Sequence, residues 1–93
     1  MLSELPIDLS KVNKKNINQE VIRVGLIAEL DAINLYEQMA QMATSPKIKK
    51  VLLDIAEEEK AHVGEFKTLL NMFDKEQVEN DKEGQQEVEE MLK

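Results

Sequence analysis

The 93-residue chain has no cysteine and no tryptophan, only 2 prolines and 3 glycines, and 3% aromatic residues. The absence of cysteine excludes a disulfide framework, a thiolate metal site and a cysteine nucleophile. No run approaches the roughly 18 apolar residues of a membrane-spanning helix, and the N-terminal segment lacks the basic start and apolar stretch of a signal peptide. We therefore expect a soluble, helix-rich chain of one domain at most, without a membrane partner.

Basic residues are few relative to acidic ones. The chain has 19 acidic and 12 basic residues and a formal charge of −7. A surface of this sign repels phosphate backbones, and no basic patch with interleaved aromatic residues is present. We expect no nucleic-acid partner and an attraction for cations.

The hydrophobic pattern divides the chain into three parts. Residues 1–15 show no apolar period, which predicts a loosely packed N-terminal arm. Residues 16–73 carry apolar residues at helical spacing with one break near Pro46, which predicts two long helices in an antiparallel hairpin. Residues 74–93 are acidic and predict a short C-terminal helix packed through one thin apolar stripe.

Residues suited to capping mark where each helix begins. Asn16 or Asn18 is the candidate N-cap of the first helix, Ser45 precedes Pro46 at the start of the second, and Asp74 introduces the third. These positions support a chain of three helices.

Each long helix has an apolar stripe that polar residues interrupt near its middle. The interruptions are Glu29 in the first helix and Glu59 with His62 in the second. Burying an ionised carboxylate without a partner is costly, and neither stripe offers Lys or Arg at this level. An ion pair explains a single Glu equally well, whereas three converging groups favour a bound cation. The predicted stripes are Ile22, Leu26, Glu29, Ile33, Tyr36 and Ala40, and Ile48, Leu52, Ile55, Glu59, His62, Phe66, Leu69 and Phe73.

Glu59 and His62 form a Glu-x-x-His pair, whose spacing places both side chains on one helix face. A two-metal carboxylate site in a four-helix bundle needs one Glu from each of two helices and one Glu-x-x-His from each of two others. With Glu29, this chain provides half of such a site, and a lone hairpin also buries too little apolar surface. The predicted fold is therefore all-α, an antiparallel hairpin plus a short helix, with a four-helix bundle completed by dimerisation. Carboxylates with one imidazole suit iron, manganese or zinc.

Further apolar residues of the first helix lie away from its stripe. They pack either on the N-terminal arm and the third helix or on another protein copy, which would produce oligomers larger than a dimer. The residues are Ile27, Leu30, Leu35 and Met42.

Residues 28–40 (Ala-Glu-Leu-Asp-Ala-Ile-Asn-Leu-Tyr-Glu-Gln-Met-Ala) and 57–62 (Glu-Glu-Glu-Lys-Ala-His) resemble the ferritin-like superfamily. The half-length form with two long helices resembles the encapsulated ferritins. That resemblance implies a ferroxidase that oxidises Fe²⁺ to Fe³⁺ with O₂ at a di-iron site shared between two subunits. It also implies a decameric ring of dimers in the cytoplasm, inside an encapsulin nanocompartment that stores the mineral.

The resemblance also implies roles for particular residues. Glu29, Glu59 and His62 match the metal ligands of the catalytic centre, and Tyr36 matches a tyrosine near the metals. The site where metal enters some relatives has two acids, of which only Asp31 is present here. Zinc, manganese or calcium is expected to be able to replace iron at these ligands.

The chain departs from the family pattern at its last residues, and two other functions are alternatives to the ferroxidase. The segment 87–93 does not resemble a shell-docking peptide, so the chain is either a cargo protein or the leading domain of a shell fusion. A rubrerythrin-like peroxide reductase is a second function, although without cysteine it needs a partner reductase. The third is a non-catalytic helical assembly module with a structural metal.

Overall fold

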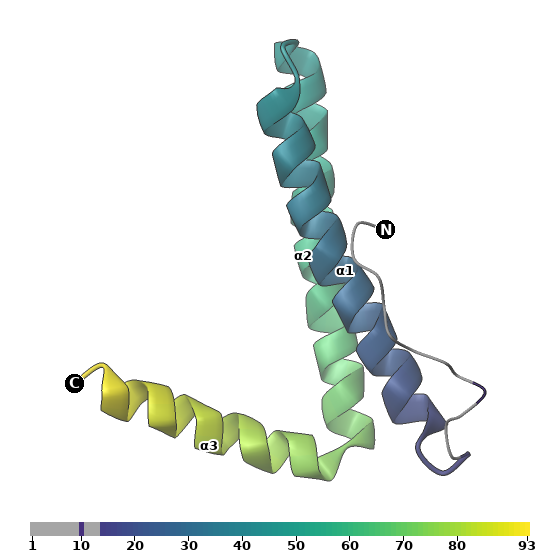
Figure 1. The fold of residues 1–93 in the computed structure, drawn as a ribbon, viewed down its shortest axis with the longest axis vertical. Coiled ribbons are helices and arrows are strands. Elements are labelled where there is room, and N and C mark those ends of the chain that lie inside the picture. Colours follow the sequence, from purple (N-terminus) through teal and green to yellow (C-terminus); the bar gives the residue numbers. More distant parts are fainter. Residues whose placement is uncertain (1–9, 11–13) are drawn as a thin grey trace.

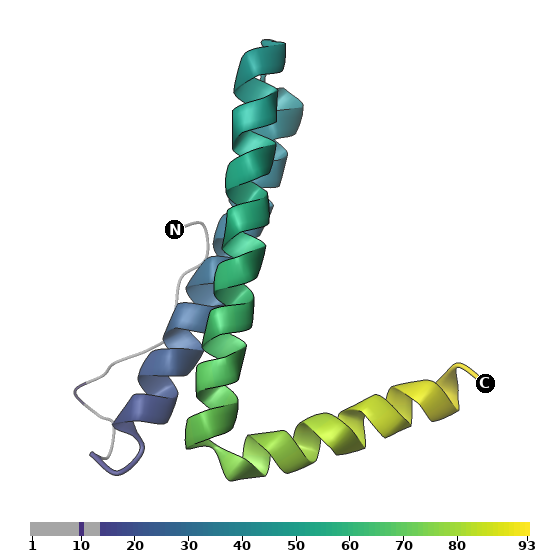
Figure 2. The same ribbon diagram turned by 180° about the vertical axis from the view of Figure 1, so that it is seen from behind.

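The computed structural model describes residue 10 and residues 14–93, which form three α-helices: α1 (Ile17–Met42), α2 (Pro46–Phe73) and α3 (Lys75–Met91). Helices α1 and α2 run antiparallel along each other, and α3 leaves the foot of this hairpin to give an L-shaped outline (Figure 1). The reverse view shows the same arrangement, with α2 in front of α1 (Figure 2). The predicted all-α hairpin with a third helix is confirmed. The predicted arm, residues 1–15, lies almost entirely outside the described residues.

Capping chemistry fixes two of the three helix starts. The Ser45 Oγ accepts a hydrogen bond from the Ile48 amide at 3.4 Å, with Pro46 in the first helical turn. The Asp74 Oδ1 accepts one from the Gln77 amide at 3.1 Å. Both caps agree with the sequence prediction, whereas Asn16 precedes α1 without a side-chain capping bond.

The seam between α1 and α2 differs in part from the predicted one. On α2 the buried residues are Ala56, Val63 and Leu70, which recur every seven residues as in a coiled coil. Ile48 and Phe73, which belong to the predicted stripe of α2, are exposed in the single chain. In the predicted stripe of α1, by contrast, Ile22 and Ala40 are buried. The seam on α2 thus lies to one side of the predicted stripe, and part of that stripe lies on the adjacent face.

The side of the hairpin next to the seam is consequently apolar and uncovered; we call it the open face. At about 100° per residue, its residues lie roughly 60–140° to one side of the seam on both helices. Because the helices are antiparallel, the same rotation brings both sets to the same side. The large apolar residues of this face are 40–58% exposed, and they are Val21, Met39, Ile48, Val51, Leu69 and Phe73.

Helix α3 makes few contacts with the hairpin. It contacts α2 near their junction and has no buried residue, and Val88, Met91 and Leu92 are exposed. The prediction of a helix is confirmed, but the prediction that it packs through an apolar stripe was wrong for this chain. The extended backbone of Asp74 turns α3 away from α2, so the stripe has nothing to pack on. Among the described residues, no helix combines the length and apolarity needed to cross a membrane.

The junction between α2 and α3 is held by the start of α1. The Arg23 Nη2 lies 2.8 Å from the Oδ2 of Asp74, a residue that is only 7% exposed. The Gln19 side chain also donates to the Phe73 carbonyl oxygen at 2.8 Å. These contacts join α1 to the point where the chain changes direction, and they therefore fix the orientation of α3.

Replacing Arg23 with alanine should lower the free energy of unfolding by about 1–2 kcal/mol. The variant leaves the buried Asp74 with fewer partners, although the partial exposure of Arg23 reduces the effect. Urea unfolding at fixed protein concentration measures it. Lys60→Ala is the matched control, because Lys60 and Glu37 form an exposed pair at 3.6 Å and its loss should cost under about 0.5 kcal/mol. Equal losses of stability in Arg23→Ala and Lys60→Ala would contradict the role given to the contact between Arg23 and Asp74.

Candidate metal centre

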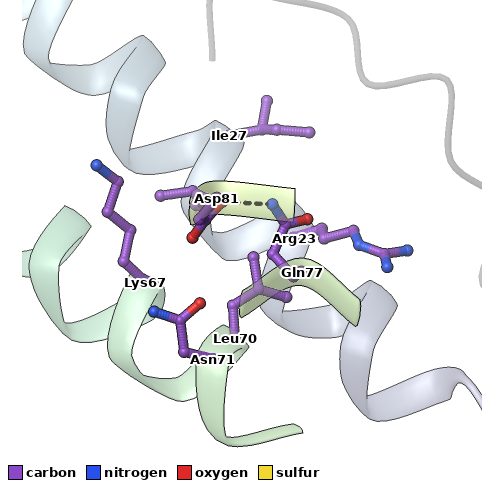
Figure 3. A pocket seen from close by; sticks show the side chains of 8 residues that line it. Arg23, Ile27, Lys67, Leu70, Asn71, Gln77 and Asp81 are labelled. Atoms are coloured by element: carbon purple, nitrogen blue, oxygen red, sulfur yellow. Dashed lines mark hydrogen bonds between the residues drawn. The ribbon is translucent and has the colours of Figure 1, made fainter. Parts of the chain in front are cut away.

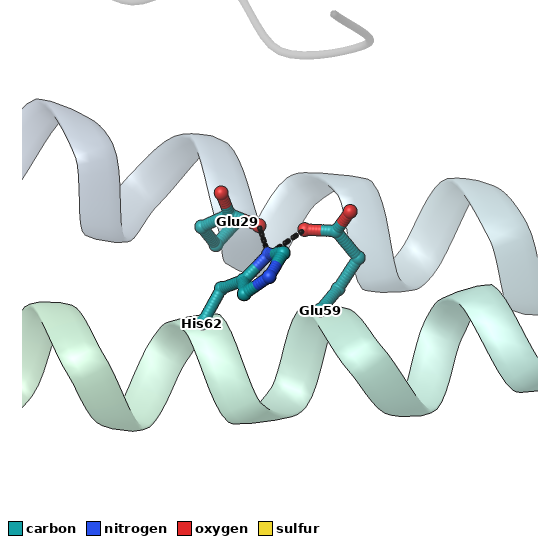
Figure 4. Close-up of side chains that lie close together, drawn as sticks. All are labelled: Glu29, Glu59 and His62. Carbon is teal, nitrogen blue, oxygen red and sulfur yellow. Dashed lines mark hydrogen bonds and ion pairs between the residues drawn. The ribbon is translucent and has the colours of Figure 1, made fainter.

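Three polar side chains converge at the middle of the hairpin. Glu29 comes from α1, while Glu59 and His62 come from α2, and the antiparallel packing places them at the same level (Figure 4). One potential ligand atom from each lies within 4.8 Å of the others. The His62 Nδ1 lies 3.5 Å from the Glu29 Oε2 and 3.4 Å from the Glu59 Oε2. The structure thus brings the three predicted residues together, and their role as ligands stays a prediction.

Burial makes this arrangement costly without a cation. The side chains of Glu29, Glu59 and His62 are 22%, 18% and 45% exposed. The Glu29 Oε2 is buried and accepts no hydrogen bond, although the His62 Nδ1 lies 3.5 Å away. In the described part of the chain, neither carboxylate pairs with a lysine or arginine. A buried carboxylate oxygen in this position is destabilising unless a positive charge satisfies it.

The donor set fits a transition metal. Bonds from zinc to imidazole nitrogen or carboxylate oxygen are about 2.0–2.2 Å long, so two ligands of one metal lie up to about 4.4 Å apart. The observed limit of 4.8 Å therefore needs only a small closure. Two carboxylates and one imidazole without sulfur suit iron, manganese or zinc. Three protein ligands also leave coordination positions open for a bridging carboxylate or a substrate.

The other predicted site residues do not join this group. Tyr36 lies two helical turns after Glu29 and is half-buried, and none of the described hydrogen bonds connects its hydroxyl to the three side chains. Asp31 follows Glu29 by two residues, which places it about 200° around α1, on a different face. A role for Tyr36 beside the metal and for Asp31 in admitting it therefore stays a prediction.

A hollow lies in the angle between the hairpin and α3 (Figure 3). It has a volume of about 500 Å³, and its lining includes Arg23, Lys67 and Asp81. The Gln77 side chain donates to the Asp81 Oδ1 at 2.7 Å across this lining. The hollow carries charges of both signs. In the described ranges the only group of three or more potential metal ligands is Glu29, Glu59 and His62, so the candidate metal site is the centre of the hairpin and not this hollow.

An antiparallel helix pair in which a Glu faces a Glu-x-x-His motif defines the ferritin-like class of carboxylate metal proteins. Comparison with known proteins agrees with this class. The family model described as Rubrerythrin matches residues 20–93. The chain therefore belongs to the rubrerythrin family.

Within this family, the chain is similar to ferritins associated with encapsulin. It is 52% identical over 93 residues to the ferritin-like-encapsulin shell fusion protein of Pyrococcus furiosus, a match covering 98% of this chain and 27% of that protein. It is 40% identical over 53 residues to the encapsulin nanocompartment cargo protein EncB of Myxococcus xanthus, covering 57% of this chain and 34% of that protein. The chain thus spans about a third or less of either curated relative.

A solved structure matches the fold over nearly the whole chain. The crystal structure of the encapsulated ferritin domain from P. furiosus has a TM-score of 0.81 and 51% sequence identity, and the match covers 97% of this chain and 94% of that one. The resemblance to encapsulated ferritins that the sequence predicted is confirmed.

Proposed function

We propose that the protein is a ferroxidase. Glu29, Glu59 and His62 from two copies of the chain would bind two Fe²⁺ ions as substrate, and the electrons would pass to O₂ with formation of Fe³⁺. The observation that carries the proposal is the buried Glu29 Oε2, which has no hydrogen-bond partner and faces a second carboxylate and an imidazole. Family membership supports an iron-related role.

A second copy is part of the proposal because the three side chains lie beside the open face. His62 is nearly half exposed there, and apolar residues of both helices surround the same side of the hairpin. Two copies packed face to face about a two-fold axis would cover this apolar surface and complete a four-helix bundle. They would also supply four carboxylates, whose charge offsets that of two divalent ions.

Each side chain has a distinct part in this scheme. Glu29 and Glu59 supply the negative charge that attracts Fe²⁺ and stabilises Fe³⁺ more strongly, which favours oxidation. His62 must release any proton at its ligating nitrogen before it binds metal, since only neutral imidazole is a ligand. The net charge of −7 raises the cation concentration near the surface.

The relatives support a location inside an encapsulin shell. One is described as a fusion with a shell protein and the other as a nanocompartment cargo protein. We propose that this protein works in the same setting, in the cytoplasm, with the encapsulin shell protein as its partner. Dimers would assemble into a larger ring, and the shell would store the Fe³⁺ mineral.

Reduction of peroxide is the second candidate, and the Rubrerythrin family match favours it. The chain has no cysteine, so a thiolate electron-transfer site would have to reside on a partner reductase. Anaerobic protein loaded with Fe²⁺ and mixed with either O₂ or H₂O₂ separates the two functions. Faster Fe³⁺ formation with O₂ than in a protein-free blank supports the ferroxidase, and turnover with only H₂O₂ and a reductant supports the alternative. Metal-dependent stability without either reaction would indicate a structural metal.

Ile48→Glu should separate the two copies and abolish fast Fe²⁺ oxidation. Ile48 lies on the open face, where a buried charge in the dimer would lack a partner. Leu53→Glu is the matched control, because Leu53 lies on the opposite side of α2 and the two side chains are similarly exposed, at 54% and 52%. Light scattering coupled to gel filtration measures the mass of each variant. A site-forming dimer that survives Ile48→Glu, or is lost with Leu53→Glu, would contradict the proposed interface.

A further inference from the structure

The aromatic ring of Phe66 occupies the space that a Cβ atom on residue 25 would fill. A Cβ built at Gly25 would lie 2.7 Å from the Cζ and 2.9 Å from the Cδ1 of Phe66, and closer still to the Cε1. Real Cβ atoms essentially never approach carbon this closely. Glycine is unfavourable inside a helix relative to alanine, so α1 bears this cost at the position where the ring rests.

This contact lies directly beside the candidate metal centre. Gly25 precedes Glu29 by four residues in α1, and Phe66 follows His62 by four residues in α2. In each helix the separation is about one turn, or roughly 6 Å along the axis. Side chains in a helix lean toward its N-terminus, so the Phe66 ring leans toward the turn that carries His62.

A side chain larger than glycine at residue 25 would disturb the packing of the two helices beside the centre. The edge atoms of the Phe66 ring belong to one rigid group, so a methyl group at residue 25 would displace the whole ring rather than a flexible chain end. The displaced ring would press toward His62 or push α2 away from α1. The ligand atoms lie within 4.8 Å of one another, a bound slightly above the roughly 4.4 Å that two ligands of one metal span. A small widening would therefore break the ligand set.

We propose that Phe66, seated on Gly25, is a positioning residue that holds His62 at metal-binding distance from Glu29. The inference rests on the proposed metal centre and adds the pair that sets its width. Neither Gly25 nor Phe66 has a group that binds metal, so both act through His62.

Titration of the full chain with Co²⁺ tests the proposal, because its visible absorbance bands report ligand geometry independently of oxidase activity. Gly25→Ala and Phe66→Leu should each weaken Co²⁺ binding roughly 10- to 100-fold, the range for groups that orient a ligand, and should change the spectrum. The double variant nearly restores the packed volume and should recover most of the affinity. Gly64→Ala is the control, since no atom lies within 4 Å of a Cβ at Gly64, and it should bind Co²⁺ like the parent.

Two results would overturn the positioning role. One is parent-like Co²⁺ affinity and spectrum in both single variants, even if both unfold more easily. The other is a double variant that binds no better than the single ones while keeping its helix content and mass. Failure of the proposed centre looks different: the parent itself would bind no Co²⁺, or His62→Ala would bind it as tightly as the parent.

Discussion

Replacing His62 with alanine is expected to reduce Fe²⁺ oxidation to the rate of a protein-free solution. The imidazole is the only nitrogen donor among the three converging side chains. Loss of a group that merely orients a ligand costs roughly 10- to 100-fold in metal affinity, and loss of the ligand itself should exceed that. Stopped-flow absorbance after mixing anaerobic protein and Fe²⁺ with O₂ measures the rate.

Glu57→Ala is the control for this experiment. Glu57 lies five residues before His62, which places it about 140° around α2, and it is exposed. It should therefore retain the parent rate, while both variants keep the parent's helix content and mass. An unchanged rate in His62→Ala would remove this residue from the centre.

Replacing Glu29 with leucine is expected to stabilise the metal-free protein while abolishing metal binding. The substitution removes a buried carboxylate oxygen that has no hydrogen-bond partner, and apolar replacements of such groups are often stabilising. The free energy of unfolding should rise by about 1–3 kcal/mol, and each kcal/mol raises Tm by roughly 4–8 °C for a domain of this size. Thermal unfolding with a chelator present, followed by titration with Fe²⁺ under anaerobic conditions, measures both effects.

A substitution that stabilises the metal-free protein but abolishes metal binding identifies a metal ligand. Replacing a residue with only a structural role would instead destabilise the metal-free protein. Glu58→Leu serves as the control, since Glu58 is exposed on α2 and its loss should change stability by less than about 0.5 kcal/mol. A metal-free Glu29→Leu protein that is less stable than the parent would show that the fold already satisfies this carboxylate.

Much of the fold could be predicted because its determinants are local in the sequence. Apolar residues at helical spacing define α1 and α2, and Ser45 and Asp74 cap helices through groups three residues away. The convergence of Glu29 with Glu59 and His62 was also predictable. Polar residues at the same level of two antiparallel apolar stripes have to face each other.

The seam of the hairpin was harder to predict because α2 is apolar over a wide arc. Periodicity alone does not distinguish the large residues at Ile48 and Phe73 from the smaller ones at Ala56 and Val63. In the structure, Ala56 and Val63 pack closely in the seam, and Ile48 and Phe73 lie on the open face. On α2 the exposed members of the predicted stripe, Ile48, Leu69 and Phe73, lie on the surface that we propose a second copy covers, whereas the α1 stripe includes the buried Ile22 and Ala40.

Contacts between residues distant in the sequence had the weakest signals. Arg23 and Asp74 are 51 residues apart, and nothing local indicates that they pair. The packing of Phe66 on Gly25 had one indication, since a glycine inside a helix suggests close approach of another element. The sequence did not indicate which side chain approaches there.

The count of irons oxidised in the fast phase tests the central claim, a two-metal centre shared between two chains. Anaerobic protein is loaded with increasing Fe²⁺ and mixed with O₂, and the amplitude of the fast Fe³⁺ absorbance is plotted against iron per chain. A break at one iron per chain is the expected result, because each chain supplies half of the ligands for two irons. An amplitude that follows the protein-free blank, or a break at two irons per chain, would contradict a shared centre.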